Sequence, residues 1–348
     1  MRLTRILLTV ATSGALVFGT SVPALADVAV TDQNSDDAVS VVESVVPDIA
    51  AETSETHEVS VSENAESVAV VVEESELIPD GVGFSVDYAT GSTPASEGMS
   101  VLETDQSGVQ AVVQPTVFGV RVLTTIASSD APSSYDYTFD VPEGTDLVKS
   151  ELSYYLESGD DVLGQIEFPW AVDAAGAQVP TSYSWDDGVL TQHVDLTDPA
   201  ITYPVVADPA WGYTYSYTLN KTAAVNKSRL KSCFNCYFPV SGAPRAFPTP
   251  GKLLPLTVGP ANFECKFKSE FSGTNYFGFQ FDATKNHVDG LGSNIVFEFR
   301  TVGGVKKLVV SAYIVNDSFW VNNPAYRLGA QNNWAKFAWN LNYTTIIT

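Results

Sequence analysis

The C-terminal part of the sequence holds one histidine, His287, in the polar stretch 282–290. Histidine suits proton transfer near neutral pH because its ordinary pKa is about 6.5. Asp289 could orient the imidazole ring, and Cys265 could be the nucleophile of a Cys/His pair. Loop histidines beside aspartates are also commonly structural or exposed, and the chain has no G-x-S-x-G signature. We therefore take His287 and Asp289 as catalytic candidates and keep the structural interpretation open.

Three cysteines, Cys233, Cys236 and Cys265, offer a second kind of chemistry. In an exported protein the default is one disulfide with one thiol left over. We expect Cys265 to pair with either Cys233 or Cys236, which would close a loop of about 30 residues. Such a bond would tie a Pro-rich stretch to the strand expected around residues 263–271.

Two other uses of these cysteines fit the sequence less well. A redox-active C-x-x-C motif needs a helix N-terminus within a βαβ unit, whereas three prolines follow Cys236 within 12 residues. Zinc binding by the three cysteines and His287 would supply four ligands, but their spacing matches no common zinc module. We therefore predict neither a bound metal nor a cofactor.

Arg300 and Lys307 are the candidates for anion binding. Apolar residues alternate in 295–299 and again in 308–314, and the intervening Gly303-Gly304 predicts a hairpin turn. Pairing about this turn places Arg300 opposite Lys307 on the outward side. Two like charges in this arrangement cost stability unless an anion relieves them, so the pattern points to an anion beside the pair.

Charge is divided very unevenly along the chain. Residues 1–211 carry four basic and 35 acidic side chains, a net charge of −31, whereas residues 212–348 carry 14 basic and six acidic ones, a net charge of +8. Such asymmetry indicates that the two parts have different partners or that each is the other's partner. The change in composition predicts a domain boundary between residues 211 and 212.

The first 26 residues have the three-part plan of a secretory signal. Arg2 and Arg5 precede an apolar run over 6–17, and Ala24-Leu25-Ala26 provides the small residues of a cleavage site. We expect cleavage after Ala26 and a secreted protein. The apolar run is too short for a membrane span of about 20 residues, and no later segment is long and apolar enough, so we expect no transmembrane segment.

Residues 27–80 hold 15 acidic side chains, no lysine, arginine or aromatic residue, and no lasting period of two or 3.6. Such a segment buries too little apolar surface to offset the entropy of ordering, so we expect an acidic disordered spacer. Residues 81–211 instead show short alternating runs, such as 135–141, with turn signals at 158–161 and 186–188. This pattern predicts an acidic all-β domain of the sandwich type.

Residues 212–348 predict a basic, aromatic-rich and mostly β α+β domain. An alternating tyrosine run and a Pro-rich section precede the hairpin described above. The last element is predicted to be a helix that begins near Asn323-Pro324. We expect it to pack on the sheet of the preceding hairpin through one apolar face, formed by Ala330, Trp334, Phe337, Ala338 and Leu341.

Two parts of the sequence resemble segments of known secreted proteins. The run PWAVDAAGAQVPTSYSWDDGVLTQHVDL (169–196) and the following YPVVADPAW (203–211) resemble a segment that precedes varied C-terminal domains in secreted proteins of high-GC Gram-positive bacteria. NHVDGLGSNIVFEF (286–299) and WAKFAWNLN (334–342) are similar to the end of small exported proteins from the same bacteria. The resemblance implies export and modular organisation and carries over no site residue.

Two hypotheses for the function follow. The basic part has 24 aromatic residues among 137, and basic residues interleaved with aromatic ones can bind anionic polymers or sugars. The leading hypothesis is an exported binding protein whose acidic domain folds with, solubilises or masks a basic domain that contacts an anionic or carbohydrate surface of the cell envelope. We do not expect nucleic acid to be its partner. The alternative is a secreted enzyme or toxin, held by an acidic N-terminal pro-part and released by cleavage of an exposed basic linker near residues 229–231.

Overall fold

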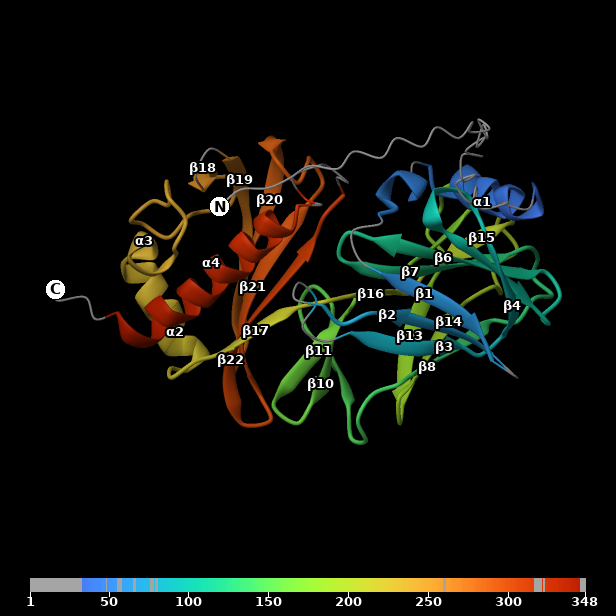
Figure 1. The fold of residues 1–348 in the computed structure, drawn as a ribbon, viewed down its shortest axis with the longest axis horizontal. Helices are drawn as coiled ribbons and strands as arrows, with labels where there is room; N and C mark the ends of the chain where they lie inside the picture. The colour runs from blue at the N-terminus through green and yellow to red at the C-terminus, as the bar shows by residue number, and fades with distance from the viewer. Residues whose placement is uncertain are drawn as a thin grey trace, which may run out of the picture. The chain divides into compact units, whose positions relative to one another are not determined.

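The computed structural model of the 348-residue chain describes residues 33–47, 49–54, 58–64, 67–75, 78, 81–258, 261–315, 321 and 323–344. The expected leader, 1–26, and its cleavage site lie outside these residues. The fold is mostly β, with three antiparallel sheets and a long C-terminal helix, which confirms the predicted fold class (Figure 1). None of the helices in the described part of the chain is both long and apolar enough to cross a membrane.

Two sheets form the sandwich-like N-terminal part. In sheet order, the first consists of β1 (Val59–Glu63), β2 (Val68–Val72), β3 (Val82–Val86), β8 (Ser134–Phe139), β14 (Val189–Val194) and β13 (Thr181–Asp186). The second consists of β4 (Ala89–Pro94), β5 (Ser100–Thr104), β6 (Val109–Thr116), β7 (Gly119–Ile126), β16 (Ala210–Gly212), β11 (Asp161–Ile166), β10 (Tyr154–Ser158) and β9 (Asp146–Lys149), with β15 (Val205–Ala207) paired to β7 and to β12 (Ala171–Asp173).

Strict alternation in the sequence builds the core of this sandwich. In β8, Tyr135, Tyr137 and Phe139 are buried while the residues between them are exposed, as expected for a strand with one face against a core. The hydroxyl of Tyr88 lies 2.9 Å from that of Tyr137 and 2.6 Å from that of Thr124 on the other sheet. These bonds satisfy polar atoms that burial would otherwise leave without a partner.

The described residues of the acidic segment 27–80 are ordered, which corrects the expectation of a disordered spacer. Helix α1 (Gln33–Val45) packs on the second sheet through Ala38, Val39, Val42 and Val45. A short 3₁₀ helix (Ile49–Glu52) follows it, and a second one (Ser96–Gly98) lies further along the chain. The residues of β2 alternate between buried and half-buried positions. Because the apolar residues of this segment are mostly valine and alanine, they bury enough surface only against the sheets that follow in the sequence.

The third sheet belongs to the C-terminal part. Its strands, in sheet order, are β17 (Tyr215–Thr218), β22 (Val305–Tyr313), β21 (Asn294–Val302), β20 (Phe277–His287), β19 (Ala261–Ser272) and β18 (Leu253–Val258). Pro255 lies in β18, at the edge of the sheet, where a residue without an N–H is tolerated. In the β21–β22 hairpin, Phe297 faces Val310 and Phe299 faces Leu308, so the predicted register is confirmed.

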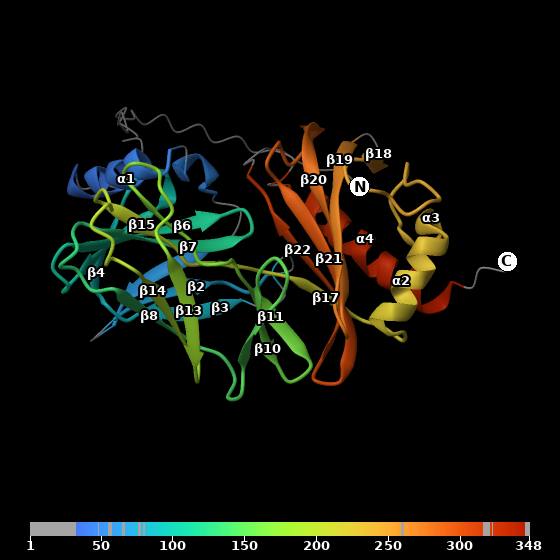
Figure 2. The same ribbon diagram turned by 180° about the vertical axis from the view of Figure 1, so that it is seen from behind.

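Three helices cover one face of this sheet: α2 (Ala223–Ser232), α3 (Phe234–Tyr237) and α4 (Pro324–Tyr343) (Figures 1 and 2). Helix α4 begins as predicted, with the side chain of Asn323 accepting a hydrogen bond of 2.9 Å from the backbone N–H of Ala325. Phe337 of its apolar face contacts Phe297 and Phe299 of the sheet. The predicted packing of the last helix on the hairpin is therefore confirmed.

Helix α2 corrects the expectation of an exposed linker at 229–231. Leu230 is fully buried against the sheet, and the guanidinium of Arg229 donates hydrogen bonds to the carbonyls of Leu341 and Thr344. A protease needs an extended and accessible segment, which this helix does not offer.

Candidate ligand-binding site

A cavity of about 340 Å³ lies between the third sheet and helix α4. Small residues on the helix leave this space open: Ala325, Gly329 and Ala330 line the cavity, and a Cβ added to Gly329 would meet no atom within 4 Å. The opposite wall is mostly aromatic because alternate residues of the strands point towards the helices. The rings of this wall come from Tyr215, Phe263, Phe281 and Phe297, while Phe238 after α3 and Trp334 of α4 also line the cavity.

Both predicted catalytic residues line this cavity. His287 ends strand β20, and the backbone N–H of Asp289 donates a hydrogen bond of 3.0 Å to its Nδ1. Nδ1 is therefore an acceptor, so a neutral imidazole carries its proton on Nε2. The carboxylate of Asp289 lies 3.6 Å from Nδ1 and accepts a hydrogen bond of 2.5 Å from the hydroxyl of Tyr326.

Burial favours the neutral forms of these two side chains. It lowers the pKa of His287, against the opposing attraction of Asp289. It raises the pKa of Asp289, against the effects of His287 and of the Tyr326 hydrogen bond. The pair differs from a catalytic dyad in which a carboxylate accepts a hydrogen bond from Nδ1, because here Nδ1 accepts a backbone hydrogen bond.

Cys265 lies on β19 and lines the same cavity. Burial, followed by the negative charges of Asp289, Asp282 and Glu264, raises the pKa of its thiol to about 12. A reactive cysteine needs the opposite surroundings, in which positive charge lowers the thiol pKa. The cavity therefore brings the proposed Cys/His pair together in an environment that suppresses its chemistry.

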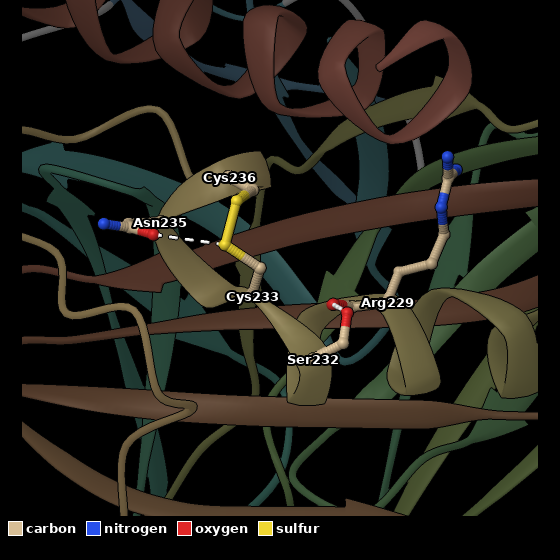
Figure 3. The surroundings of a disulfide bond; sticks show 5 residues. All are labelled: Arg229, Ser232, Cys233, Asn235 and Cys236. Atoms are coloured by element: carbon tan, nitrogen blue, oxygen red, sulfur yellow. Dashed lines mark hydrogen bonds between the residues drawn. A yellow bond between two sulfur atoms is a disulfide. The ribbon is translucent and has the colours of Figure 1, made fainter. Parts of the chain in front are cut away.

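The disulfide joins Cys233 to Cys236, with 5.3 Å between their Cα atoms (Figure 3). The prediction that Cys265 would form the disulfide is wrong, since Cys265 is a buried free thiol. The first two cysteines meet because α2 ends at Ser232 and α3 starts at Phe234, which places them on either side of one turn. The zinc site of three cysteines and His287 that the sequence analysis considered is not formed, because two of the cysteines form this disulfide. Within the described residues, no group of three or more potential ligands could hold a metal ion.

Arg300 and Lys307 lie opposite each other across the hairpin as predicted, on the face of the sheet away from the cavity. The anions beside them belong to the protein itself. Arg300 is 2.6 Å from Glu157 and 3.3 Å from Glu298, and Lys307 is 3.7 Å from carboxylate oxygens of both Asp160 and Asp161. Both basic side chains are mostly buried, so this pair is not an open site for an external anion.

Tyr213, Tyr326 and Arg327 are among the polar residues of the cavity that sequence reasoning missed. The guanidinium of Arg327 donates from Nη2 to the hydroxyl of Tyr213 at 2.7 Å and to the carbonyl of Val117 at 3.4 Å. The helix period could have found it, because Arg327 lies three residues before Ala330 and seven before Trp334 and so extends the predicted apolar face. A charged residue on such a face is a signal for a functional site.

These polar groups surround an apolar space that a small molecule could fill. No family model, curated protein or solved structure matches this chain.

Proposed function

We propose that the protein is an exported binding protein whose C-terminal part takes a small, mainly apolar molecule into the cavity beneath α4. The observation that carries this proposal is the aromatic-walled cavity itself, kept open by Ala325, Gly329 and Ala330. Ligand sites in proteins are concave, mostly apolar and contain a few converging polar groups, with volumes of roughly 300–1,000 Å³. The cavity has each of these properties.

Binding is better supported than catalysis. Burial favours the neutral imidazole of His287 and the neutral carboxyl of Asp289, and it raises the pKa of the Cys265 thiol to about 12. Acid–base catalysis with a nucleophile needs groups poised to exchange protons near the working pH, and a thiol of this kind is not. The three side chains instead give the wall a few hydrogen-bonding positions.

Fluorescence titration with Nile red, a neutral apolar dye, tests the proposal on the mature chain. We expect one dye molecule per chain, displaced by decanol. Ala330→Leu should weaken dye binding at least about tenfold, because a larger side chain fills the cavity. Ala335→Leu makes the same change at an exposed position of α4 outside the cavity, so it should leave affinity unchanged. Absent dye binding, or equal affinities of the two variants, would refute the proposal.

A separate observation favours a second function, contact with the cell envelope. Trp339 and Tyr343, on the outer face of α4, are 59% and 62% exposed, and their ring centroids lie 5.5 Å apart. Lys336 is exposed one turn earlier. Exposed aromatic faces next to a cation suit sugars and anionic polymers. The acidic N-terminal part would then neutralise basic residues of the C-terminal part that do not contact the envelope. The ion pairs of Arg300 with Glu157 and of Lys307 with Asp160 support this role.

Co-sedimentation of the mature chain with cell-wall material over a salt series tests this second function. The double variant Trp339→Ala/Tyr343→Ala should reduce the bound fraction of the protein. Leu253→Ala, which truncates an exposed apolar side chain on β18, serves as the control and should leave the bound fraction unchanged. Equal binding by all three proteins would count against it. The alternative function, an enzyme or toxin released by cleavage at 229–231, is not supported, because Leu230 is buried.

A further inference from the structure

We propose that the molecule held in the cavity is an amphiphile with one carboxylate, and that Arg327 binds this carboxylate while the aromatic walls hold the apolar chain. This inference rests on the proposed cavity function and adds the chemical class of the ligand.

Among the residues that the structure describes, Arg327 is a buried cation without a carboxylate partner. It is 5% exposed, and in the described part of the chain no carboxylate lies within 4 Å of its guanidinium. Nη2 makes two hydrogen bonds to uncharged oxygens, whereas Nη1 has none among the residues described. A buried charge that lacks a counter-ion is costly, so the charge of the guanidinium and the N–H donors of Nη1 would stabilise an anion that enters the cavity.

The other two largely buried arginines show what Arg327 lacks. Arg121 lies 2.9 Å from Glu52, and Arg300 lies 2.6 Å from Glu157. The fold thus supplies each of them with a carboxylate from a distant part of the sequence. Arg327, which alone of the three lines the cavity, has no such carboxylate in the described ranges, so a ligand could neutralise it.

Asp289 does not fill this role although it lines the same cavity. Its Oδ1 accepts from Tyr326, and Oδ2 faces His287 at 3.6 Å. Burial raises its pKa and so favours its neutral form. Among the described residues, Arg327 therefore has a cation–π contact with the Tyr213 ring, 5.2 Å from its centroid, but no carboxylate partner beside this apolar space.

A single carboxylate matches this charge best. A guanidinium binds a carboxylate through paired N–H donors, and one negative charge neutralises it. A doubly charged phosphate would bring a second charge into a buried site that offers no second cation among the lining residues described, which is unfavourable.

Calorimetric titration of the mature chain with decanoate, decanol and decyl phosphate, at about pH 8 where carboxylic acids are ionised, tests this inference. We expect decanoate to bind at least about tenfold more tightly than decanol, the range of a hydrogen bond to a charged group. Arg327→Met should abolish this preference and keep decanol affinity within about threefold, because methionine retains an apolar stem. Arg327→Lys should retain part of the preference. Arg245→Met removes an exposed arginine of the same part and should change nothing.

The outcomes separate the two proposals. If none of the three probes binds, the cavity function itself fails. If decanol binds as tightly as decanoate, or decyl phosphate binds more tightly, the cavity function stands and the carboxylate class is wrong. If Arg327→Met keeps the decanoate preference, Arg327 is not the anchor. Circular dichroism checks whether Arg327→Met folds. If it does not fold, the ratio of the decanoate affinity to the decanol affinity, measured for the wild type and for Arg327→Lys, still decides whether the ligand is a carboxylate bound by Arg327.

Discussion

Arg300 of β21 lies 2.6 Å from Glu157 of β10, two residues that are 143 positions apart in the sequence. The guanidinium also lies over the ring of Tyr155, 4.8 Å from its centroid. Close approach of two turns accompanies this pairing, since a Cβ added to Gly303, at φ +52°, would meet the carbonyl of Gly159 at 2.1 Å. The β10–β11 hairpin thus supplies the negative charge that neutralises Arg300 of the β21–β22 hairpin.

Loss of the Arg300 cation should destabilise the protein strongly. Arg300→Met leaves the carboxylates of Glu157 and Glu298 mostly buried without their partner, and we expect a loss of about 3 kcal/mol in the free energy of unfolding. Urea denaturation measures this change. Lys268→Met, which breaks the exposed pair with Asp282, should cost less than about 1 kcal/mol.

The double variant Arg300→Met/Glu157→Gln completes a thermodynamic cycle with the two single variants. Because the two side chains contact each other, its destabilisation should be smaller than the sum of the single losses. Additive losses would show that the ion pair contributes nothing beyond its separate members.

The disulfide between Cys233 and Cys236 predicts which cysteine carries the free thiol. Alkylation of the unfolded, unreduced protein should label Cys265 alone, as read by peptide mass analysis. Cys233→Ala/Cys236→Ala should cost about 2 kcal/mol, because a bond closing only four residues removes little entropy from the unfolded chain. A label on Cys233 or Cys236 would contradict this pairing.

The native protein should protect Cys265 from alkylation. With its thiol pKa raised to about 12, the thiolate fraction falls, and iodoacetamide should react roughly a thousandfold more slowly than with the unfolded chain. Rate measurements in buffer and in urea give this ratio, and Cys265→Ser provides the unlabelled control. Equal rates in both solvents would mean that the thiol is neither buried nor desolvated.

Stability should decrease in mild acid because of His287. Its pKa is lowered below the ordinary 6.5, so the folded state binds a proton less readily than the unfolded state. The stability that this histidine contributes is present above about pH 6.5 and is lost as pH falls through the lowered pKa, with a limiting slope of about 1.4 kcal/mol per pH unit. His287→Gln keeps Asp289 in place and should remove this part of the pH dependence. Identical pH profiles of unfolding for the two proteins would contradict a buried, neutral His287.

Local periodicity in the sequence was enough to predict strand β8, the register of the β21–β22 hairpin and the last helix. Alternation about Gly303-Gly304 pairs Arg300 with Lys307 in only one register, and the apolar face of α4 follows from its 3.6-residue period. Both features depend on residues close in sequence, whose geometry the backbone alone dictates. The composition of the acidic segment was less reliable, because α1 and β2 are stabilised by later strands.

Only the tertiary structure decided which distant groups meet. Cys265 could have paired with either other cysteine by sequence separation, yet its strand buries it beside the cavity while Cys233 and Cys236 share one turn. The anion beside Arg300 comes from a residue far earlier in the chain, whereas none of the described carboxylates reaches Arg327. Such contacts depend on distances in space between remote segments, which no periodicity along the chain encodes.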